Sequence, residues 1–304
     1  MALPLLDVLI VGGGPAGLSA ALLLARCRRR VLLVDAGRPR HAPARALHGF
    51  LTRDGVSPAA LRRAAHAELR RYGVERRRAS AIHARRDRAF EVTLDSGEIL
   101  AARKLLLAGG VRDILPDIPG LRGLYGRRVH HCPYCDAFEY RDRCLVACGR
   151  GAAGVALAER LTGWTGEVLL CGPGLDSGLR SRAAASGIRV LRGALTRVAR
   201  EGDGVRLRIG DADVRCAALF VSSPHSQGME FSRDLGCALD GQGCLRTDRR
   251  LQTTVAGVFA AGDLTAGPEF AIVAAAKGTL AAWAINEDFL LEERRLRASG
   301  VRPR

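Results

Sequence analysis

A glycine-rich turn close to the N-terminus constrains the fold of this chain more than any other feature. The apolar run from Asp7 to Val11 predicts a short buried strand, and Gly12-Gly13-Gly14-Pro15-Ala16-Gly17 follows it directly. An Ala- and Leu-rich segment comes next and predicts a helix. Gly12 allows the tight turn, Gly14 lets a pyrophosphate approach the backbone, and Gly17 lets the helix pack closely on the strand. This order predicts a dinucleotide-binding fold.

The residues that follow the turn support this expectation. Pro15 and Ala16 open the helix, whose N-terminus would face the phosphates of a bound dinucleotide. The next strand, predicted from Arg30 to Val34, ends in Asp35. A carboxylate at this strand end is placed to accept hydrogen bonds from ribose hydroxyls. The complete set favours a bound dinucleotide over a glycine-rich turn without a ligand.

The same order of elements returns in the middle of the chain. A strand predicted from Cys144 to Cys148 precedes a second glycine fingerprint at Gly149, Gly151 and Gly154, and a helix and another strand follow. This is an internal duplication of one plan rather than a short-period repeat. Between the two copies, residues 90–94 alternate and predict an antiparallel hairpin with residues 99–100, and a separate apolar strand is predicted from Lys104 to Ala108.

The end of the chain carries a strand and a helix without a fingerprint of their own. The strand is predicted from Val258 to Ala261, Gly262 and Asp263 follow it, and the helix runs from about Phe270 to Leu290. We expect these elements to complete the first domain. The sequence therefore predicts an α/β fold of two dinucleotide-binding (Rossmann-like) three-layer domains, the second inserted into the first. The first would comprise residues 1–115 and 240–304, and the second residues 116–239.

A cysteine pair opens the predicted insertion, in the order His131-Cys132-Pro133-Tyr134-Cys135-Asp136. Two intervening residues let the sulfurs of Cys132 and Cys135 form a disulfide and reopen it, so the pair is a two-electron switch. Asp136 can shuttle a proton to a departing thiolate, and His131 can stabilise or generate one. A zinc site completed by Cys144 and Cys148 is the alternative, but those cysteines lie in an apolar strand, so we predict no metal.

Composition excludes several classes of function. The formal net charge is +16, but the arginines are scattered along the chain and lysine occurs only at Lys104 and Lys277, which argues against nucleic-acid binding. Nine cysteines are an odd number in a long, core-rich chain, which favours a reducing cytoplasm over a disulfide framework. Arginines at 26 and 28–30 end the only candidate for a membrane span, so we expect no membrane insertion.

Taken together, these motifs resemble the low-molecular-weight thioredoxin reductase family of flavoproteins, and the resemblance covers essentially the whole chain. It implies FAD in the outer domain, commonly in a homodimer. By the same resemblance, Cys135 would lie nearer the flavin, Cys132 would meet the substrate, and Asp136 would be the acid or base. The implied FAD contacts are Gly12, Gly14, Pro15, Ala16, Gly17, Asp35, Ala108, Gly262, Asp263, Phe270 and Ala271.

The chain departs from the family where NADPH would bind. NADPH-dependent members carry a His-Arg-Arg cluster after the second strand of the inserted domain, whereas this chain has Cys171-Gly172-Pro173-Gly174. No acid stands at that strand end to hold the ribose of NAD. Arg180 and Arg182 follow a little later and could substitute. The second fingerprint is therefore either a retained structural turn or a working nicotinamide site.

The cysteine segment also resembles one branch of the family, the dithiol oxidases that close disulfides in natural products such as holomycin and gliotoxin. In that branch dioxygen reoxidises the flavin and no nicotinamide is needed. His48 would help to wall the flavin and substrate pocket, unless it is a helix-capping or core histidine. His130 and His225 are expected to be ordinary surface or loop residues.

The sequence therefore predicts an FAD-dependent dithiol oxidase that acts on a small-molecule dithiol with O2 as the electron acceptor. One alternative is an NADPH-dependent thioredoxin-disulfide reductase, which runs the same cysteine switch in reverse. The other is a flavin redox sensor without turnover, whose partner reads the state of the cysteines.

Overall fold

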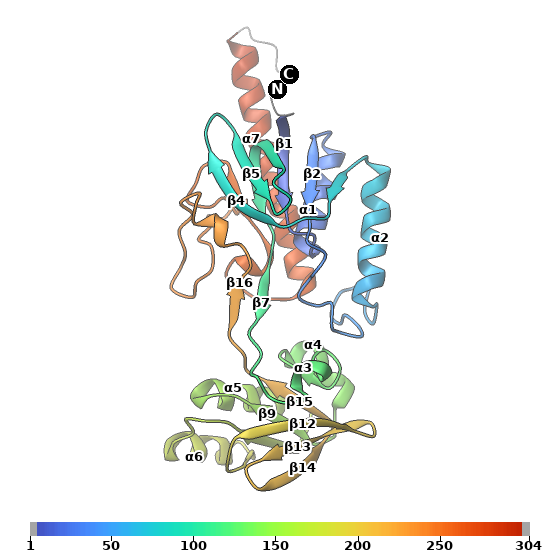
Figure 1. Ribbon diagram of the computed structural model, residues 1–304, viewed down its shortest axis with the longest axis vertical. Helices are drawn as coiled ribbons and strands as arrows, with labels where there is room; N and C mark the ends of the chain where they lie inside the picture. Colours follow the sequence, from blue (N-terminus) through green and yellow to red (C-terminus); the bar gives the residue numbers. More distant parts are fainter. Residues whose placement is uncertain (1–4, 300–304) are drawn as a thin grey trace. The chain divides into compact units, whose positions relative to one another are not determined.

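The computed structural model describes residues 5–299 and divides the chain into two compact units. The first unit contains residues up to 40, 59–112 and those from 226 on, and the second contains 41–58 and 113–225 (Figure 1). The units differ from the predicted domain limits at 41–58, 113–115 and 226–239. Segment 41–58 packs on the second unit so tightly that an added Cβ at Gly126 would lie 2.5 Å from the carbonyl carbon of Pro43. The predicted limits of 116–239 stay a proposal.

Within the described residues, the first unit is built on a seven-stranded sheet. The order is β3-β2-β1-β6-β5-β4, and β17 pairs with β6. The strands are β1 (Leu5–Val11), β2 (Val31–Val34), β3 (Glu75–Arg77), β4 (Ala81–Arg86), β5 (Phe90–Leu94), β6 (Ile99–Leu107) and β17 (Val258–Ala260). Its helices are α1 (Pro15–Arg26), α2 (Pro58–Arg71) and α7 (Ala271–Ala298). Because β17 joins this sheet in parallel with β6, the end of the chain completes the first unit as predicted.

One strand was wrongly predicted as two. Residues 99–100 and 104–108 were assigned to separate strands, but β6 runs without a break from Ile99 to Leu107. It pairs antiparallel with β5 through its first residues and parallel with β1 through its last. Lys104 interrupts the apolar pattern, yet it is only 6% exposed and its Nζ lies 2.6 Å from a carboxylate oxygen of Glu292 on α7.

Helix α7 also extends further than predicted, to Ala298 rather than about Leu290. The last turns of α7 carry acidic side chains. These pair with one arginine on β6 and with another in the loop between α1 and β2. Glu292 accepts from Arg103 at 2.8 Å, and Glu293 pairs with Arg29. These ion pairs replace the apolar contacts by which a helix is usually recognised in a sequence.

Within the described residues, the second unit also has a central sheet, which is parallel and has five strands. The order is β11-β10-β9-β15-β8. The strands are β8 (Val129–His130), β9 (Leu145–Cys148), β10 (Val168–Cys171), β11 (Arg189–Val190) and β15 (Ala218–Val221). A three-stranded antiparallel sheet of β12 (Leu195–Glu201), β13 (Gly204–Ile209) and β14 (Ala212–Cys216) packs on one face, and α5 (Gly151–Leu161) and α6 (Ser177–Ala185) pack on the other. The three-layer α/β plan predicted for the insertion is confirmed.

The remaining short elements connect these layers. They are β7 (Val111–Asp113), β16 (His225–Gln227), α3 (Leu121–Leu124), α4 (Pro133–Asp136) and the 3-10 turns η1 (Ala137–Tyr140), η2 (Glu230–Ser232) and η3 (Gly262–Leu264). Strand β7 pairs with β16, where the chain enters and leaves the second unit.

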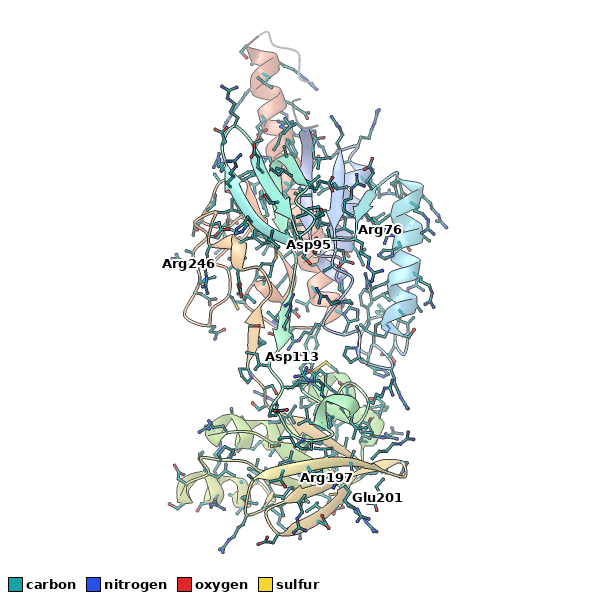
Figure 2. All side chains as sticks on the ribbon, in the orientation of Figure 1. Arg76, Asp95, Asp113, Arg197, Glu201 and Arg246 are labelled. Carbon is teal, nitrogen blue, oxygen red and sulfur yellow. A yellow bond between two sulfur atoms is a disulfide. The ribbon has the colours of Figure 1, made fainter. Side chains whose placement is uncertain are left out.

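The cationic side chains are distributed over many elements. Arg76 on β3, Arg197 on β12 and Arg246 in the segment before β17 lie on separate parts of the fold (Figure 2). Between residues 5 and 299, no helix combines the length and apolar character that a membrane-crossing segment requires. Within the same range, no three His, Cys, Asp or Glu side chains are grouped as metal ligands.

Candidate active site

The first glycine turn has the shape that a dinucleotide requires. Gly12 has φ +114°, and a Cβ added there would lie 2.1 Å from the carbonyl oxygen of Ala108. A Cβ at Gly17 would lie 1.8 Å from the carbonyl oxygen of Gly12, so α1 can approach β1 only if this residue is glycine. In contrast, a Cβ at Gly14 would have no neighbour within 4 Å. The backbone is therefore crowded from behind at Gly12 and Gly17 and open at Gly14, on the side where a pyrophosphate would lie.

The N-terminus of α1 keeps its amide groups available. Gly14 is the N-cap and has no side chain to accept a hydrogen bond from them, and Pro15 occupies the first helical position. Ala16 is buried against α7, where a Cβ added to Gly278 would lie 2.0 Å from its carbonyl oxygen. The amides of this helix end are thus free to bind an anion, and their position is fixed by the packing of two helices.

Asp35 lies at the end of β2, as predicted, but it has a partner that sequence reasoning missed. Its Oδ1 accepts a hydrogen bond from the amide of Gly37 at 3.1 Å, and its Oδ2 accepts one from Nη2 of Arg62 on α2 at 2.5 Å. The carboxylate also lies over the turn, because a Cβ at Gly13 would be 2.4 Å from its Cγ. Asp35 is thus held by Arg62 at the position where a ribose would bind.

Asp263 follows Gly262, which has φ +76°, in the turn before α7. Its Oδ2 lies 3.2 Å from Nη1 of Arg40. Burial raises the pKa of the Asp263 carboxyl, and the charge of Arg40 opposes that rise. Phe270 caps α7 and Ala271 begins it, so the predicted flavin contacts at this end of the sheet fall on one turn and one helix N-terminus. Arg40 gave no signal in the sequence because its partner is more than two hundred residues away.

These features fit FAD. The turn leaves open backbone for a pyrophosphate, Asp35 can accept hydrogen bonds from a ribose, and the segment around Asp263 presents a polar side chain beside the N-terminus of a long helix. Gly12, Gly14, Gly17, Asp35 and Asp263 are the residues of the first unit that would hold the cofactor.

The redox cysteines lie in the second unit. Cys132 and Cys135 form a disulfide with a Cα–Cα distance of 5.3 Å across the short helix α4. Cys132 is the N-cap of this helix, and its Sγ accepts a hydrogen bond from the amide of Cys135 at 3.2 Å. Tyr134 between them is 64% exposed, and its ring is nearly perpendicular to that of Trp164, with the ring centroids 5.6 Å apart. The disulfide is thus carried by one helical turn, and an amide is directed at the sulfur of Cys132.

The second glycine fingerprint is well formed, and the two arginines that follow it differ in their contacts. A Cβ at Gly154 would lie 2.5 Å from the carbonyl oxygen of Gly149, so helix and strand pack as closely as in the first unit. Arg182 is bound to Glu159, with distances of 2.7 and 2.5 Å. The Nε of Arg180 donates to the carbonyl oxygen of Leu175 at 2.8 Å. Arg182 is therefore paired with Glu159, whereas Arg180 lines a hollow together with Gly172, Pro173 and Gly174.

Two dinucleotide-type units and a redox disulfide are typical of one class of flavoenzyme. The family model described as "Pyridine nucleotide-disulphide oxidoreductase" matches residues 6–278. The chain belongs to this family. The membership confirms the predicted thioredoxin-reductase-like fold, FAD as the cofactor and an oxidoreductase activity.

Several curated relatives match this disulphide oxidoreductase. Thioredoxin reductase sirT of Leptosphaeria maculans is 29% identical over 304 residues, which are 92% of this chain and 93% of that protein. Thioredoxin reductase tcpT of Claviceps purpurea is 31% identical, over 85% of this chain and 86% of its own length. A probable thioredoxin reductase of Arthroderma benhamiae is 39% identical over 151 residues, which are 47% of this chain and 37% of that protein.

Solved structures show the same fold over nearly the whole oxidoreductase. The crystal structure of HlmI has a TM-score of 0.91 and 35% sequence identity, and the match covers 97% of this chain and 96% of that chain. An oxidoreductase from Agrobacterium tumefaciens has a TM-score of 0.87 and 32% identity, over 95% and 99% of the two chains.

The histidine next to the disulfide is held in place by a tyrosine. Nδ1 of His131 lies 2.7 Å from the hydroxyl of Tyr125, and this hydroxyl donates to Oδ2 of Asp113, the last residue of β7, at 2.8 Å. The rings of Tyr125 and His131 stack at 5.9 Å. His131 is thus placed beside the redox pair in a fixed orientation, which is compatible with the role predicted for it.

The expectation for His130 was wrong. It was assigned to the surface or to a loop, but it ends β8 and is 4% exposed. Its Nδ1 lies 3.2 Å from Oδ1 of Asp136, and its Nε2 lies 3.1 Å from the hydroxyl of Tyr140. A strand of only two residues has no alternation from which this burial could have been recognised. His225, in contrast, is exposed as expected.

His48 lies in the second unit between two carboxylates. Its Nδ1 is 3.5 Å from Oδ2 of Asp54, and its Nε2 is 3.5 Å from Oε1 of Glu139 on η1, the turn that follows α4. Asp54 accepts a hydrogen bond from the amide of Gly49, which lowers the pKa of its carboxyl, and His48 lowers it further. The structure therefore places His48 close in space to the segment of the redox helix.

Proposed function

We propose that this oxidoreductase is an FAD-dependent dithiol oxidase, which closes a disulfide in a small-molecule dithiol with O2 as the final electron acceptor. The observation that carries the proposal is the segment Gly172-Pro173-Gly174 after β10, which supplies no cationic side chain where the resemblance implies a cluster, together with the pairing of Arg182 with Glu159. A charge-assisted hydrogen bond to a 2′-phosphate contributes about 1.5 to 3 kcal/mol, which is roughly one to two orders of magnitude in NADPH affinity.

The chain's own residues supply the thiol chemistry. A thiolate of the substrate attacks Sγ of Cys132, and the electron pair of the broken disulfide moves to Cys135, which becomes a thiolate. The second sulfur of the substrate then attacks the first, the product disulfide forms, and Cys132 leaves with the electron pair. The amide of Cys135, directed at Sγ of Cys132 at 3.2 Å, stabilises the negative charge on that leaving group.

Bound FAD would supply the two-electron acceptor that restores the cysteine disulfide and is itself reoxidised by O2, with release of hydrogen peroxide. Asp136 is part of the proposal as the acid and base of the exchange, and His131 as the neighbour that stabilises a thiolate. A homodimer and a cytoplasmic location are further parts of it, and they follow from the family resemblance and the cysteine content.

A thioredoxin-disulfide reductase dependent on NADPH is the second candidate, and the names of the relatives sirT and tcpT, both thioredoxin reductases, favour it. The two functions differ in the reductant that reaches the flavin. Under anaerobic conditions, we expect an aliphatic dithiol to bleach the bound flavin and micromolar NADPH to leave it oxidised. In air, the same dithiol should consume O2 and release hydrogen peroxide without an added nicotinamide.

Rapid bleaching by NADPH, coupled to cleavage of a thioredoxin disulfide, would establish the reductase instead. A flavin that is reduced by neither reagent at a useful rate would favour the redox sensor. Cys135→Ser serves as the control, because it retains the FAD turn of the first unit and removes the disulfide.

A further inference from the structure

A lysine on α7 binds the backbone of the loop that precedes this helix. The ammonium of Lys277 donates to the carbonyl oxygens of Ala266 at 2.9 Å, Thr265 at 3.1 Å and Gly262 at 3.5 Å. All three acceptors lie within residues 262–266, in or directly after the turn η3. One side chain therefore gathers three carbonyl groups of a single short loop.

The number of acceptors matches the number of donors on an ammonium group. A carbonyl oxygen can only accept a hydrogen bond, so each contact uses one N–H, and a lysine ammonium offers three of them on one nitrogen. An arginine guanidinium instead spreads its donors over three nitrogens in one plane. The space beside Nζ of Lys277 is also limited, because a Cβ added at Gly267 would lie 3.4 Å from it. The site therefore fits lysine better than arginine.

Lysine is rare in this chain, so its presence here is informative. It stands at only two of the 47 positions that carry Lys or Arg, Lys104 and Lys277. Lys104 is buried and donates to the carboxylate of Glu292 at 2.6 Å. At every other position the chain uses arginine for positive charge. Lys277 thus stands where arginine could not place three donors on one atom.

The loop that Lys277 holds packs on the first glycine fingerprint. A Cβ added at Gly262 would lie 3.2 Å from the Cβ of Ala16. Gly278 directly follows Lys277, and a Cβ added there would lie 2.0 Å from the carbonyl oxygen of the same Ala16. Ala16 lies in the first turn of α1, whose N-terminus would face the pyrophosphate of FAD. The ammonium, the loop and the phosphate-binding end of α1 are therefore packed together.

The same loop carries Asp263, whose carboxylate would face FAD. Oδ2 of Asp263 lies 3.2 Å from Nη1 of Arg40, and this guanidinium also binds Oε2 of Glu269 at 2.5 Å. Arg40 thus holds the carboxylate of Asp263, and Lys277 holds the backbone on both sides of it. The position of Asp263 depends on both cations.

We propose that Lys277 is a positioning residue for FAD, whose ammonium fixes the turn of Gly262 and Asp263 against the N-terminus of α1 through three backbone carbonyl groups. Its effect on the cofactor passes through that turn. The inference needs only the FAD of this family, and it holds whether O2 or NADPH exchanges electrons with the flavin.

The first test measures the dissociation constant of FAD by equilibrium dialysis of the full chain. Lys277→Met keeps the apolar stem of the side chain and removes every donor. We expect it to weaken FAD binding about tenfold or more, since a single hydrogen bond to a charged group already contributes that much. Lys277→Arg restores the charge but not the three donors on one nitrogen, so we expect it to leave FAD binding weakened.

Lys104→Met is the matched control, because it removes the other lysine and its ion pair with Glu292 but leaves the loop untouched. It should lower the melting temperature and leave the dissociation constant of FAD unchanged. At saturating FAD, the visible circular dichroism of the flavin should change in Lys277→Met and not in Lys104→Met. Unchanged FAD affinity in Lys277→Met, or full affinity in Lys277→Arg, would overturn the inference.

The second test uses the unsubstituted protein, so it does not depend on the folding of a variant. If the contacts of Lys277 favour bound FAD, bound FAD must favour those contacts to the same extent. Acetic anhydride acylates a free amine and not an engaged ammonium, and mass spectrometry then compares Lys277 with Lys104 as the internal reference. We expect Lys277 to react about tenfold more slowly, relative to Lys104, in excess FAD than after removal of FAD. Equal relative rates in the two samples would contradict the proposed role.

Discussion

Gly278→Ala tests how tightly the FAD turn depends on helix packing. An added Cβ at this position on α7 would lie 2.0 Å from the carbonyl oxygen and 2.8 Å from the Cα of Ala16. These are backbone atoms of α1, so no side chain can rotate out of the way, and the helices must separate by roughly 1 Å or strain their geometry. Ala16 belongs to the turn that would hold the pyrophosphate, so the displacement reaches the cofactor site.

The magnitude follows from two opposing effects. Replacing a helical glycine with alanine gains about 1 kcal/mol in helix propensity. Overpacking usually costs about 1 to 3 kcal/mol, and contact with fixed backbone places Gly278→Ala at or above the upper end of that range. We therefore expect a net loss of about 2 kcal/mol in the free energy of unfolding, or a melting temperature lower by about 5 °C.

The assay is the rise of flavin fluorescence on heating, which reports loss of FAD from the fold. Gly178→Ala on α6 is the matched control, because its Cβ would meet no atom closer than 3.5 Å, in ordinary contact with Oδ1 of Asp176. We expect Gly178→Ala to release FAD at the same temperature as the unsubstituted protein or slightly higher. A Gly278→Ala protein that retains FAD to an equal or higher temperature would refute the argument from helix packing.

Three further predictions follow from the site. Cys132→Ser and Cys135→Ser should each abolish dithiol turnover and leave the 450 nm flavin band in place; residual turnover of more than about one per cent in an oxygen electrode would argue against the disulfide route. Asp35→Ala should weaken FAD retention about tenfold or more in equilibrium dialysis, because a ribose acceptor is lost and Arg62 is left without its carboxylate; unchanged affinity would place the ribose elsewhere. Burial raises the pKa of the Cys144 thiol to about 11, so its alkylation by iodoacetamide, followed by mass spectrometry, should rise about tenfold for each pH unit from 8 to 10; a rate that levels off by pH 9 would contradict that pKa.

Much of this fold could be predicted because its signals are local. The turn at Gly12 to Gly17, the strand that ends in Asp35 and the second fingerprint at Gly149 are each contained in a few consecutive residues. A backbone that must bend sharply or approach another backbone needs glycine at fixed spacing, whatever the rest of the chain does. The same is true of Cys132 and Cys135, because the two residues between them let their sulfur atoms come within bonding distance.

The errors occurred where a residue's role depends on a distant partner. Lys104 interrupted an apolar pattern and split β6 in the prediction, although Glu292 neutralises it from α7. Arg62 and Arg40 gave no signal, since the carboxylates that they bind are far away in the sequence. Burial of His130 arises from the packing of β8 against β15 and η1, and neither neighbour can be identified from a two-residue strand.

The sequence by itself therefore determined the class of fold, the cofactor and the redox pair, because short-range backbone geometry encodes them. Only the tertiary structure decided which charges are paired. It paired Arg182 with Glu159 and brought His130 to Asp136. The physical reason is that an ion pair needs both charged groups within about 4 Å of each other, and side chains that are separated in the sequence meet only when their elements pack.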